Sequence, residues 1–261
     1  MNYKVVFLDI DGTILMPDHT YSPSTKDAID QLKKQGIEVF IATGRPLHEV
    51  KWLGDELNIS SYIGYNGALA LYRNETIVNE PMNRSLVENF VRIAKEHDHE
   101  IILFSNEKNY VTTLDRPVMQ TFIDTFQLKN NEWLTEDVLD QILSISVINC
   151  KQEDRVHYQI DENLRLSDIN VHGIKDSFDV IRVHVNKGEA VKKVLQRLNI
   201  KTEECIAFGD GMNDKEMLQT AGEGFAMGNS HPNLIPYAKH LTTNVTDSGI
   251  YNGLKTLGLV K

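Results

Sequence analysis

The chain has 261 residues, a formal net charge of −10 and 41% hydrophobic residues, which is typical of a globular protein. Its acidic balance and its lack of a dense Lys/Arg block disfavour nucleic acid and anionic membranes as partners, because both need a concentrated positive field. At about 150 residues per domain, this length allows one large domain or two smaller ones.

The first residues and the cysteines indicate a cellular compartment. Met1–Phe7 carries one Lys and a short apolar run that leads directly into acidic residues, unlike a signal peptide or a membrane span. Cys150 and Cys205 are the two cysteines, and neither has a Cys or His partner at metal-site spacing. We therefore expect a cytoplasmic protein with two reduced structural thiols.

Short apolar runs alternate with amphipathic helical patterns in the first third of the chain. The pattern predicts strands at Lys4–Leu8, Ile37–Ala42 and Tyr62–Gly64, with helices between them at Ser24–Lys34 and Pro46–Leu57. The first residue of the first helix, a serine, is its expected cap. This alternation indicates a parallel sheet.

The middle of the chain, from about Met82 to Ile181, has a different rhythm and is interpreted as an inserted α+β domain. The elements predicted there are helices at Ser85–Glu96 and Thr135–Leu143 and strands at Ile101–Phe104, Ser144–Asn149 and Val156–Ile160. The last third then returns to the alternation of the first. Its predicted elements are helices at Lys187–Leu198 and Asp214–Ala221, strands at Cys205–Phe208 and around Phe225, and short elements ending near Leu257.

The sharpest motif is Asp9-Ile10-Asp11-Gly12-Thr13, where the first predicted strand ends. In a parallel α/β sheet, ligands bind outside the carboxyl ends of the strands, so both carboxylates are expected at a binding crevice. The alternative is an Asp-Gly turn that closes a hairpin and needs no function. Further polar clusters after other strands favour the binding crevice.

Two clusters are suited to phosphate. Thr43-Gly44-Arg45 follows the second strand, where a hydroxyl and backbone N–H groups ahead of a helix can hold a phosphate oxygen. Lys187 opens a helix, where its charge opposes the helix dipole and so suggests an anionic partner. The alternatives are an ordinary helix cap and a solvated surface lysine.

The last cluster is Gly209-Asp210-Gly211-Met212-Asn213-Asp214, after another apolar strand. Asp210 and Asp214 are four positions apart and can approach one side of the turn. Mg²⁺ prefers oxygen ligands of this type. A calcium loop is disfavoured, because the register differs from the EF-hand pattern and no Glu stands at the twelfth position.

Taken in order, these four clusters resemble the motifs of the haloacid dehalogenase-like hydrolases. The segments Ala42-Thr43-Gly44-Arg45 and Asn66-Gly67-Ala68 are similar to those of the Cof-type phosphatase subfamily, and Ala226-Met227-Gly228-Asn229 extends the match. The resemblance implies an α/β fold with a Rossmann-like parallel-sheet core, formed by residues 1–81 and 182–261 with helices on both faces. Residues 82–181 become an inserted α+β cap domain.

The resemblance also implies a mechanism. Asp9 becomes the nucleophile that forms an aspartyl-phosphate, and Asp11 the general acid and base. Asp9, the backbone carbonyl of Asp11, and Asp210 hold Mg²⁺. The residues expected to hold the phosphoryl oxygens are Thr43, Gly44, Lys187, Asn213 and backbone N–H groups near Ile10. Asp214 is expected to support the metal through waters or to orient Lys187, and Arg45 is a further candidate.

The cap is expected to exclude water and to select the leaving group. Asn66, which follows a core strand, and Arg182 and His184, on the return to the core, are substrate candidates. Arg182 and His184 equally fit the alternation of a half-exposed strand. His97 and His99 offer a weak metal pattern, but a solvated helix end over Glu96–Glu100 is the preferred interpretation.

The sequence thus predicts a phosphatase of small phosphorylated metabolites, with sugar phosphates first and phosphorylated cofactors second. A phosphomutase of the same superfamily is the alternative within enzymes, and dehalogenase chemistry is disfavoured because it does not need Asp210. A non-catalytic phosphate-binding regulatory protein is the other alternative, which the presence of Asp9, Asp11 and Lys187 disfavours. The pattern carries no signal for an oligomeric state.

Overall fold

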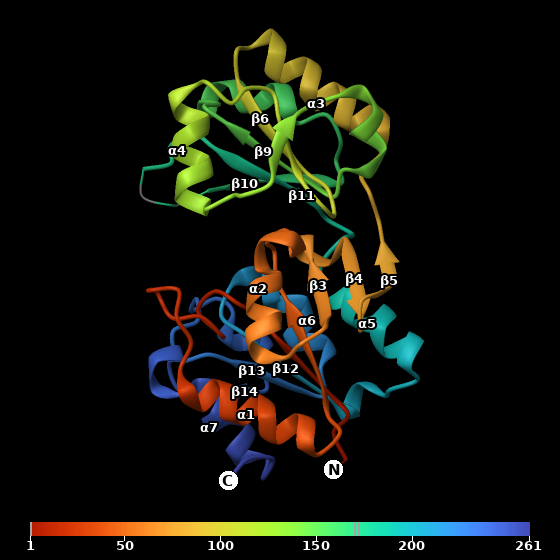
Figure 1. Ribbon diagram of the computed structural model, residues 1–261, viewed down its shortest axis with the longest axis vertical. Helices are drawn as coiled ribbons and strands as arrows, with labels where there is room; N and C mark the ends of the chain where they lie inside the picture. Colours follow the sequence, from red (N-terminus) through yellow and green to blue (C-terminus); the bar gives the residue numbers. More distant parts are fainter. Residues whose placement is uncertain (1, 170, 172) are drawn as a thin grey trace. The chain divides into compact units, whose positions relative to one another are not determined.

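The computed structural model describes residues 2–169, 171 and 173–261 (Figure 1). The chain divides into two compact units, of which the first comprises Met1–Arg45, Val50–Asn79 and Asn186–Lys261. The second comprises Pro46–Glu49 and Glu80–Val185. The boundaries at residues 82 and 181 that the sequence suggests for an inserted domain stay a prediction.

The first unit contains an eight-stranded sheet in the order β14-β13-β12-β1-β2-β3-β4-β5. Its strands are β1 (Val5–Leu8), β2 (Glu38–Ala42), β3 (Ser61–Gly64), β4 (Leu69–Tyr72), β5 (Glu75–Asn79), β12 (Cys205–Gly209), β13 (Glu223–Ala226) and β14 (His240–Leu241). The predicted parallel sheet is confirmed from β14 to β3. The antiparallel strands β4 and β5 are an addition that the sequence analysis missed.

Helices cover both faces of this sheet. They are α1 (Pro23–Lys34), α2 (Leu47–Leu57), α5 (Lys187–Leu198), α6 (Lys215–Thr220) and α7 (Gly249–Thr256). Helices α5 and α6 contact each other and share an apolar cluster with Val5 and Phe7 of β1. On the other face α7 contacts α1, and Gly253 of α7 packs against the ring of Phe208. The central strands are therefore buried on both sides.

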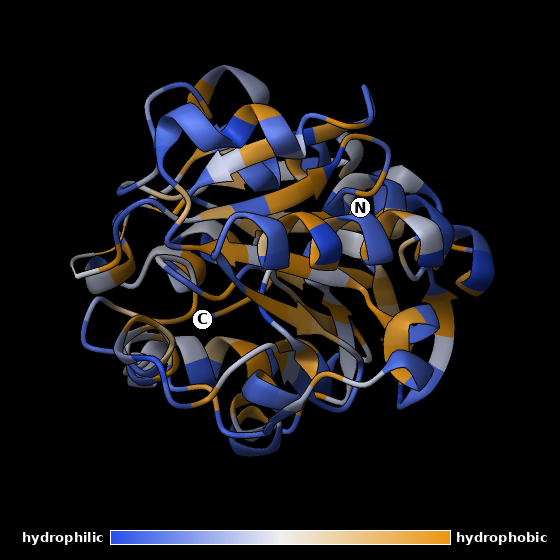
Figure 2. Cartoon of the chain, turned by 90° about the horizontal axis from the view of Figure 1, so that it is seen from above, coloured by the Kyte–Doolittle hydropathy of each residue, from blue (hydrophilic) through white to orange (hydrophobic). Residues whose placement is uncertain are grey.

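The sequence of β1 explains why it occupies the middle of the sheet. All four residues, Val5–Leu8, have 0% exposure, and successive side chains point to opposite faces. A continuous apolar run suits a strand with both faces covered. Figure 2 shows this distribution, with orange strands and helices that carry both orange and blue residues.

The second unit is built on a six-stranded sheet in the order β10-β11-β9-β6-β7-β8. Its strands are β6 (Glu100–Phe104), β7 (Asn109–Val111), β8 (Asn131–Trp133), β9 (Ser144–Ile148), β10 (Leu164–Asp168) and β11 (Phe178–Arg182), and its helices are α3 (Arg84–Glu96) and α4 (Pro117–Phe126). Val87 and Phe90 of α3 pack with Ile101 and Leu103 of β6 in one apolar cluster. This amphipathic packing gives the unit a core of its own.

Two elements predicted for the middle block are wrong. Val156–Ile160 is not a strand, because a 3₁₀ helix spans Gln152–Tyr158. Its Tyr158 is fully buried, whereas Val156 is 61% exposed, so the alternation marks one anchored side chain and no sheet face. The helix predicted at Thr135–Leu143 is a shorter 3₁₀ helix, Glu136–Gln141.

Two helix starts also differ from the prediction. Ser22, and not Ser24, caps α1, because its hydroxyl accepts a hydrogen bond from the N–H of Thr25. The helix predicted to begin at Asp214 is preceded by a 3₁₀ turn, Met212–Asp214, and α6 begins at Lys215. Both differences move a helix boundary by one or two residues.

The solvated helix end expected over Glu96–Glu100 is only half right. Helix α3 ends at Glu96, and His99, just before β6, and Glu100, its first residue, are 7% and 3% exposed. The ring of His97 stacks on His157 with centroids 3.9 Å apart. These histidines therefore belong to the packing of the second unit.

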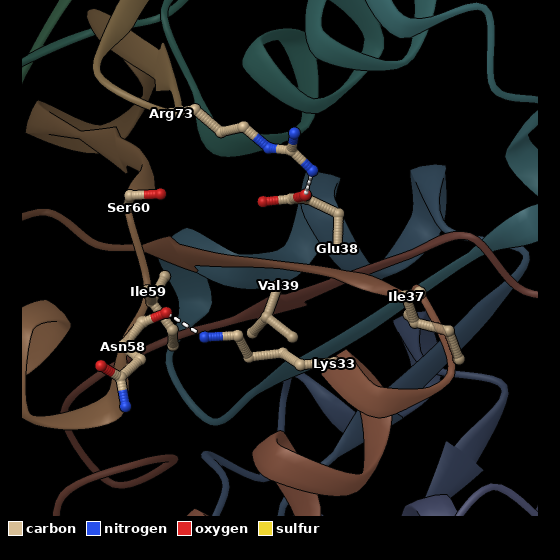
Figure 3. A pocket seen from close by; sticks show the side chains of 9 residues that line it. Lys33, Ile37, Glu38, Val39, Asn58, Ile59, Ser60 and Arg73 are labelled. Atoms are coloured by element: carbon tan, nitrogen blue, oxygen red, sulfur yellow. Dashed lines mark hydrogen bonds and ion pairs between the residues drawn. The ribbon is translucent and has the colours of Figure 1, made fainter.

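A pocket of about 220 Å³ lies at the amino-terminal ends of β2 and β3 (Figure 3). Lys33 at its wall donates a hydrogen bond to the carbonyl oxygen of Asn58, and Arg73 donates to Glu38 at 2.9 Å. Both cations are thus bound by the chain itself. Among the described residues, no helix combines the length and apolarity needed to cross a membrane.

Candidate active site

The carboxyl ends of neighbouring strands carry the first site residues. Strand β1 lies between β12 and β2, and its Leu8 pairs with Phe208 on one side and Ile41 on the other. Asp9 directly follows β1, and Asp210 directly follows β12. Because parallel strands end at the same edge, the sheet brings these carboxylates together from distant parts of the chain.

Lys187, the first residue of α5, lies between two carboxylates. Its Nζ donates a hydrogen bond to Oδ1 of Asp9 at 2.5 Å and to Oδ1 of Asp214 at 2.6 Å. Burial lowers the pKa of Lys187, but the charges of Asp214 and Asp9 outweigh burial, and the net shift is upward. Lys187 is therefore a fully buried cation that is held by two anions.

Asp214 fixes both the lysine and the loop around it. Its Oδ1 binds Lys187, while its Oδ2 accepts hydrogen bonds from the N–H groups of Asp210 and Gly211, each at 3.0 Å. The side chain of Asp214 has no exposed surface. Both of its oxygens are engaged, so this residue orients its neighbours.

The carboxylates of the site outnumber its buried lysine. Burial raises the pKa of Asp9 well above its ordinary value, and the charge of Asp214 raises it further, although Lys187 acts in the opposite direction. Burial, followed by the charge of Asp214, raises the pKa of Asp210 to about 7. The site therefore has an excess of negative charge that a bound cation can neutralise.

The donor set fits a hard divalent cation. Asp9, Asp210 and Asp214 each offer one carboxylate oxygen, and these oxygens lie within 4.8 Å of one another. The turn beside them requires a glycine: Gly12 has a φ of +78°, and a Cβ there would lie 2.3 Å from Oδ2 of Asp210. Closely spaced carboxylate oxygens are the ligands that Mg²⁺ takes in proteins.

Asp11 lies on the same loop but has different surroundings. Arg45 donates from Nε to Oδ2 of Asp11 at 2.8 Å and from Nη2 to Oδ1 at 2.5 Å. The side chain of Asp11 is 52% exposed and that of Arg45 is 35% exposed. Asp11 is thus accessible, and a two-pronged guanidinium holds it at the edge of the cluster.

The loop after β2 lies against the loop after β12. Thr43 is 1% exposed, and its hydroxyl oxygen accepts a hydrogen bond from the N–H of Arg45 at 3.0 Å. Asn213 donates from Nδ2 to Oδ1 of Asn66 at 3.0 Å. A Cβ added at Gly44 would meet the same Asn66 side chain at 3.0 Å. The expected phosphate residues Thr43, Gly44 and Asn213 are therefore connected through Asn66.

Ile10 has a structural task that the sequence did not indicate. Its side chain is fully buried, and its carbonyl oxygen accepts hydrogen bonds from the N–H groups of Ile14 and Leu15 at 2.9 and 2.8 Å. These bonds close the turn that carries Asp9 and Asp11. The expected role of a nearby N–H group in phosphate binding stays a prediction.

Arg182 and His184 belong to the second unit, where the chain itself supplies their partners. The guanidinium of Arg182 donates to the carbonyl oxygens of Glu80 at 2.8 Å and Leu143 at 3.2 Å. Burial lowers the pKa of Arg182. Nε2 of His184 lies 3.0 Å from Oδ1 of Asn163. Their proposed contact with a substrate stays a prediction.

Asn229 is a site residue that the sequence analysis named only as part of the segment Ala226–Asn229, without assigning it a role. Its Nδ2 donates to the carbonyl oxygen of Gly12 at 2.8 Å and lies 3.5 Å from Oδ2 of Asp210. Its Oδ1 accepts a hydrogen bond from the N–H of Val245 at 2.9 Å. Asn229 comes shortly after β13, which ends at the same edge as β12, so its position was a usable signal.

Comparison with known sequences identifies the family. A sequence profile of haloacid dehalogenase-like hydrolases matches residues 6–254, nearly the whole chain. The chain belongs to this family. Among the haloacid dehalogenase-like hydrolases it is a Cof-type member, as the motifs at Thr43 and Asn66 indicated.

Its relatives include named phosphatases. The Bacillus subtilis protein YkrA, which is named as a phosphatase, is 33% identical over 263 residues and is covered, like this chain, over its full length. An HMP-PP phosphatase of Cronobacter sakazakii is 28% identical over 242 residues, which cover 89% of this chain and 87% of the relative. This haloacid dehalogenase-like hydrolase is therefore a phosphatase.

Solved structures support the same fold. A protein from Geobacillus kaustophilus HTA426 is 29% identical and matches with a TM-score of 0.91, over 99% of this chain and 100% of that chain. A Bacteroides thetaiotaomicron phosphatase of the family is 26% identical with a TM-score of 0.84, over 99% and 96% of the two chains. The predicted α/β fold of a haloacid dehalogenase-like hydrolase is confirmed.

Proposed function

We propose that this phosphatase depends on magnesium and hydrolyses small phosphorylated metabolites through an aspartyl-phosphate on Asp9. The observation that carries the proposal is the buried cluster in which Lys187 binds Asp9 and Asp214, with Asp210 beside them. It supplies a fixed nucleophile, a fixed cation and a set of oxygen ligands. Positioning and charge stabilisation are most of what phosphoryl transfer needs from a protein.

In the first transfer, a carboxylate oxygen of Asp9 attacks phosphorus while the bond from phosphorus to the leaving oxygen breaks. Asp11 donates a proton to that leaving oxygen. The accessible position of Asp11 supports this role, because the leaving group must reach it from solvent. Arg45, which now binds both oxygens of Asp11, has to free one of them for the transfer.

In the second transfer, water attacks the phosphorus of the aspartyl-phosphate. Asp11, now ionised, accepts a proton from that water, and the bond between phosphorus and Asp9 breaks. Inorganic phosphate leaves and both carboxylates return to their initial states. Lys187 remains bound to Asp214 and keeps positive charge beside the reacting oxygens.

Asp9, Asp210 and the backbone carbonyl of Asp11 are the proposed ligands of Mg²⁺. When bound, the ion supplies positive charge that screens the attacking carboxylate from the phosphate. Asp214 is assigned to positioning, because Lys187 and two N–H groups already engage its oxygens. Thr43, Gly44, Lys187 and Asn213 are the proposed partners of the phosphoryl oxygens.

The proposed substrates are sugar phosphates first and phosphorylated cofactors second. The relative from Cronobacter sakazakii, named an HMP-PP phosphatase, supports a small metabolite. The second unit, with its own sheet and core, is the proposed cap that selects the leaving group. Arg182 and His184 are its candidate contacts, and the carbonyl oxygens of Glu80 and Leu143 hold the Arg182 guanidinium in place.

The test measures phosphate release from a broad panel of phosphorylated metabolites, with Mg²⁺ or with EDTA. The native protein is compared with Asp9→Asn, which keeps the size of the side chain and removes the nucleophilic charge. Phosphate release that needs both Mg²⁺ and Asp9 supports the mechanism. So does a phosphate label that stays on Asp9 after the reaction is quenched with acid. Release that persists in Asp9→Asn contradicts it.

Two other outcomes identify the alternatives. A phosphorylated isomer in place of free phosphate indicates a phosphomutase, which also uses an aspartyl-phosphate. Binding of phosphate or Mg²⁺ without turnover of any substrate indicates a regulatory binding protein. Substrate ranking within the panel decides between sugar phosphates and phosphorylated cofactors.

A further inference from the structure

Three consecutive residues beside the site have a left-handed backbone. Tyr65, Asn66 and Gly67 have φ angles of 52°, 53° and 108°. Glycine adopts such angles freely and asparagine tolerates them, but a buried tyrosine does so at a cost. Tyr65 is 3% exposed. Strain of this kind persists only where the surroundings hold it, and it is often found at functional sites.

Backbone contacts hold this turn between two parts of the site. The N–H of Asn66 donates to the carbonyl oxygen of Thr43 at 3.1 Å. On the other side, a Cβ added at Gly67 would lie 2.4 Å from the carbonyl oxygen of Asn186, the residue before Lys187. The turn therefore fits tightly between the loop after β2 and the start of α5.

The side chain of Asn66 reaches a third part of the site. Its Oδ1 accepts a hydrogen bond from Nδ2 of Asn213 at 3.0 Å. Its carboxamide also covers Gly44, where an added Cβ would lie 3.0 Å from Oδ1 and 3.1 Å from Nδ2. One side chain thus connects the loops after β2 and β12, which both carry proposed phosphate partners.

Asn213 needs such a partner because its own side chain is exposed. A free carboxamide on a surface loop samples several rotamers, and ordering it on ligand binding costs conformational entropy. A hydrogen bond made before the ligand arrives removes part of that cost. The orientation of Asn213 is therefore set by the left-handed turn and not by its own loop alone.

We propose that Asn66 is a positioning residue, which the left-handed turn Tyr65–Gly67 aims at Asn213 so that the Asn213 side chain is oriented before phosphate binds. This inference rests on the proposed function of the same site. Asn66 acts through Asn213, so its effect is expected in the affinity for phosphate more than in the chemical step.

The variant Asn66→Gly tests the carboxamide separately from the turn. Glycine adopts a positive φ without strain, so the turn is kept while the side chain is removed. The probe is inorganic phosphate, with its dissociation constant measured by calorimetry in the presence of Mg²⁺. We expect binding about tenfold weaker, with the midpoint of urea unfolding unchanged or raised.

Asn199→Gly is the matched control. Asn199 also has a positive φ, 52°, but it is exposed and ends α5 at the far end from Lys187. The same chemical change there is expected to leave phosphate affinity unchanged. Equal affinity for phosphate in Asn66→Gly and the native protein overturns the proposal.

A double-mutant cycle tests whether Asn66 acts through Asn213. Asn213→Ala alone and Asn213→Ala with Asn66→Gly are expected to bind phosphate with affinities within about twofold of each other, because the second change removes a partner already lost. If the fold-losses in phosphate affinity of the two single variants multiply in the double variant, the positioning role is overturned. Asn66→Ala, which also removes the acceptor oxygen, replaces Asn66→Gly in this cycle if the glycine variant does not fold.

A spectroscopic readout separates this inference from the proposed function. The side-chain amide resonance of Asn213 is expected to move in Asn66→Gly and to stay near its native position in Asn66→Asp, with no ligand present. An unmoved resonance in Asn66→Gly overturns the orientation claim. A native protein that neither binds nor releases phosphate refutes the proposed function instead, and the resonance still decides the role of Asn66.

Discussion

The ammonium of Lys187 lies 2.6 Å from the carboxylate of Asp214, and neither side chain has any exposed surface. The same ammonium binds Asp9, so the orientation of this proposed nucleophile depends on the ion pair between Lys187 and Asp214. A buried ion pair contributes little by itself, but removal of one partner leaves an uncompensated charge.

Lys187→Met is therefore expected to destabilise the protein at pH 8 by about 3 kcal/mol or more, since two buried carboxylates lose their cation. Urea unfolding measures the change. Lys192→Met is the control on the same helix, because Lys192 pairs with Glu189 on the surface and is 56% exposed. A loss in Lys187→Met no larger than in this control contradicts the buried-pair account.

Arg45→Lys tests the contact with Asp11. A lysine offers a single charged point in place of the fork that binds both oxygens, so the orientation of Asp11 is lost. We expect kcat to fall about tenfold and KM to change less, because the proposed proton transfer is affected. Arg73→Lys, which alters a similar pair with Glu38 at the opposite edge of the sheet, is expected to have native kinetics.

Mg²⁺ is expected to raise the thermal unfolding midpoint, because it neutralises the excess charge of Asp9 and Asp210 in the folded state only. An excess of EDTA reverses the rise. Asp210→Asn removes a proposed ligand and is expected to abolish the rise, whereas Asp27→Asn, on the exposed side of α1, keeps it. The same Mg²⁺-induced rise in Asp210→Asn would refute the ligand assignment.

Asp179 of β11 gives the second unit a pH-dependent stability. Burial raises its pKa to about 6, although a hydrogen bond from Ser146 acts in the opposite direction. The folded pKa lies above the unfolded value of about 3.9, so the folded state binds the Asp179 proton more tightly than the unfolded state does. This proton-linked contribution to stability is complete below the unfolded pKa and is lost as pH rises through 6. Asp179→Asn is expected to gain stability relative to the native protein between pH 4 and 7.

The gain is about 3 kcal/mol, given 1.36 kcal/mol for each unit of the pKa shift from about 3.9 to about 6. Urea unfolding at several pH values measures it, and Asp124→Asn, an exposed position on α4, provides the comparison. If the difference in unfolding free energy between Asp179→Asn and the native protein does not vary with pH, Asp179 is not the source of the pH dependence.

The strand ends were predictable because their signals are local. An apolar run followed by an acidic residue, as at Leu8 and Asp9, marks the point where a buried strand reaches solvent. Parallel topology then implies that Asp210 and Thr43 share that edge, and the structure places them there. The position of Lys187 at the start of α5 followed in the same way from helical periodicity.

Features that depend on backbone angles or on tertiary contacts were not predictable. The left-handed turn at Asn66 leaves no periodic pattern of hydrophobic residues in the sequence, so it is visible only in the three-dimensional structure. The hairpin between β4 and β5 has positive φ at Arg73 and Asn74, a turn in which Asn was the one available cue. The strand predicted at Val156–Ile160 failed because one buried tyrosine imitated alternation.

The position of β1 in the middle of its sheet has a consequence for biosynthesis. On one side Val5 pairs with Glu38, which is synthesised soon after it. On the other side Val5 pairs with Cys205, which is synthesised 200 residues after Val5. One edge of the apolar strand β1 therefore stays unpaired until most of the chain has been synthesised, and unpaired strand edges promote aggregation. We expect slow folding governed by this late closure and a nascent chain that benefits from chaperones until β12 is released.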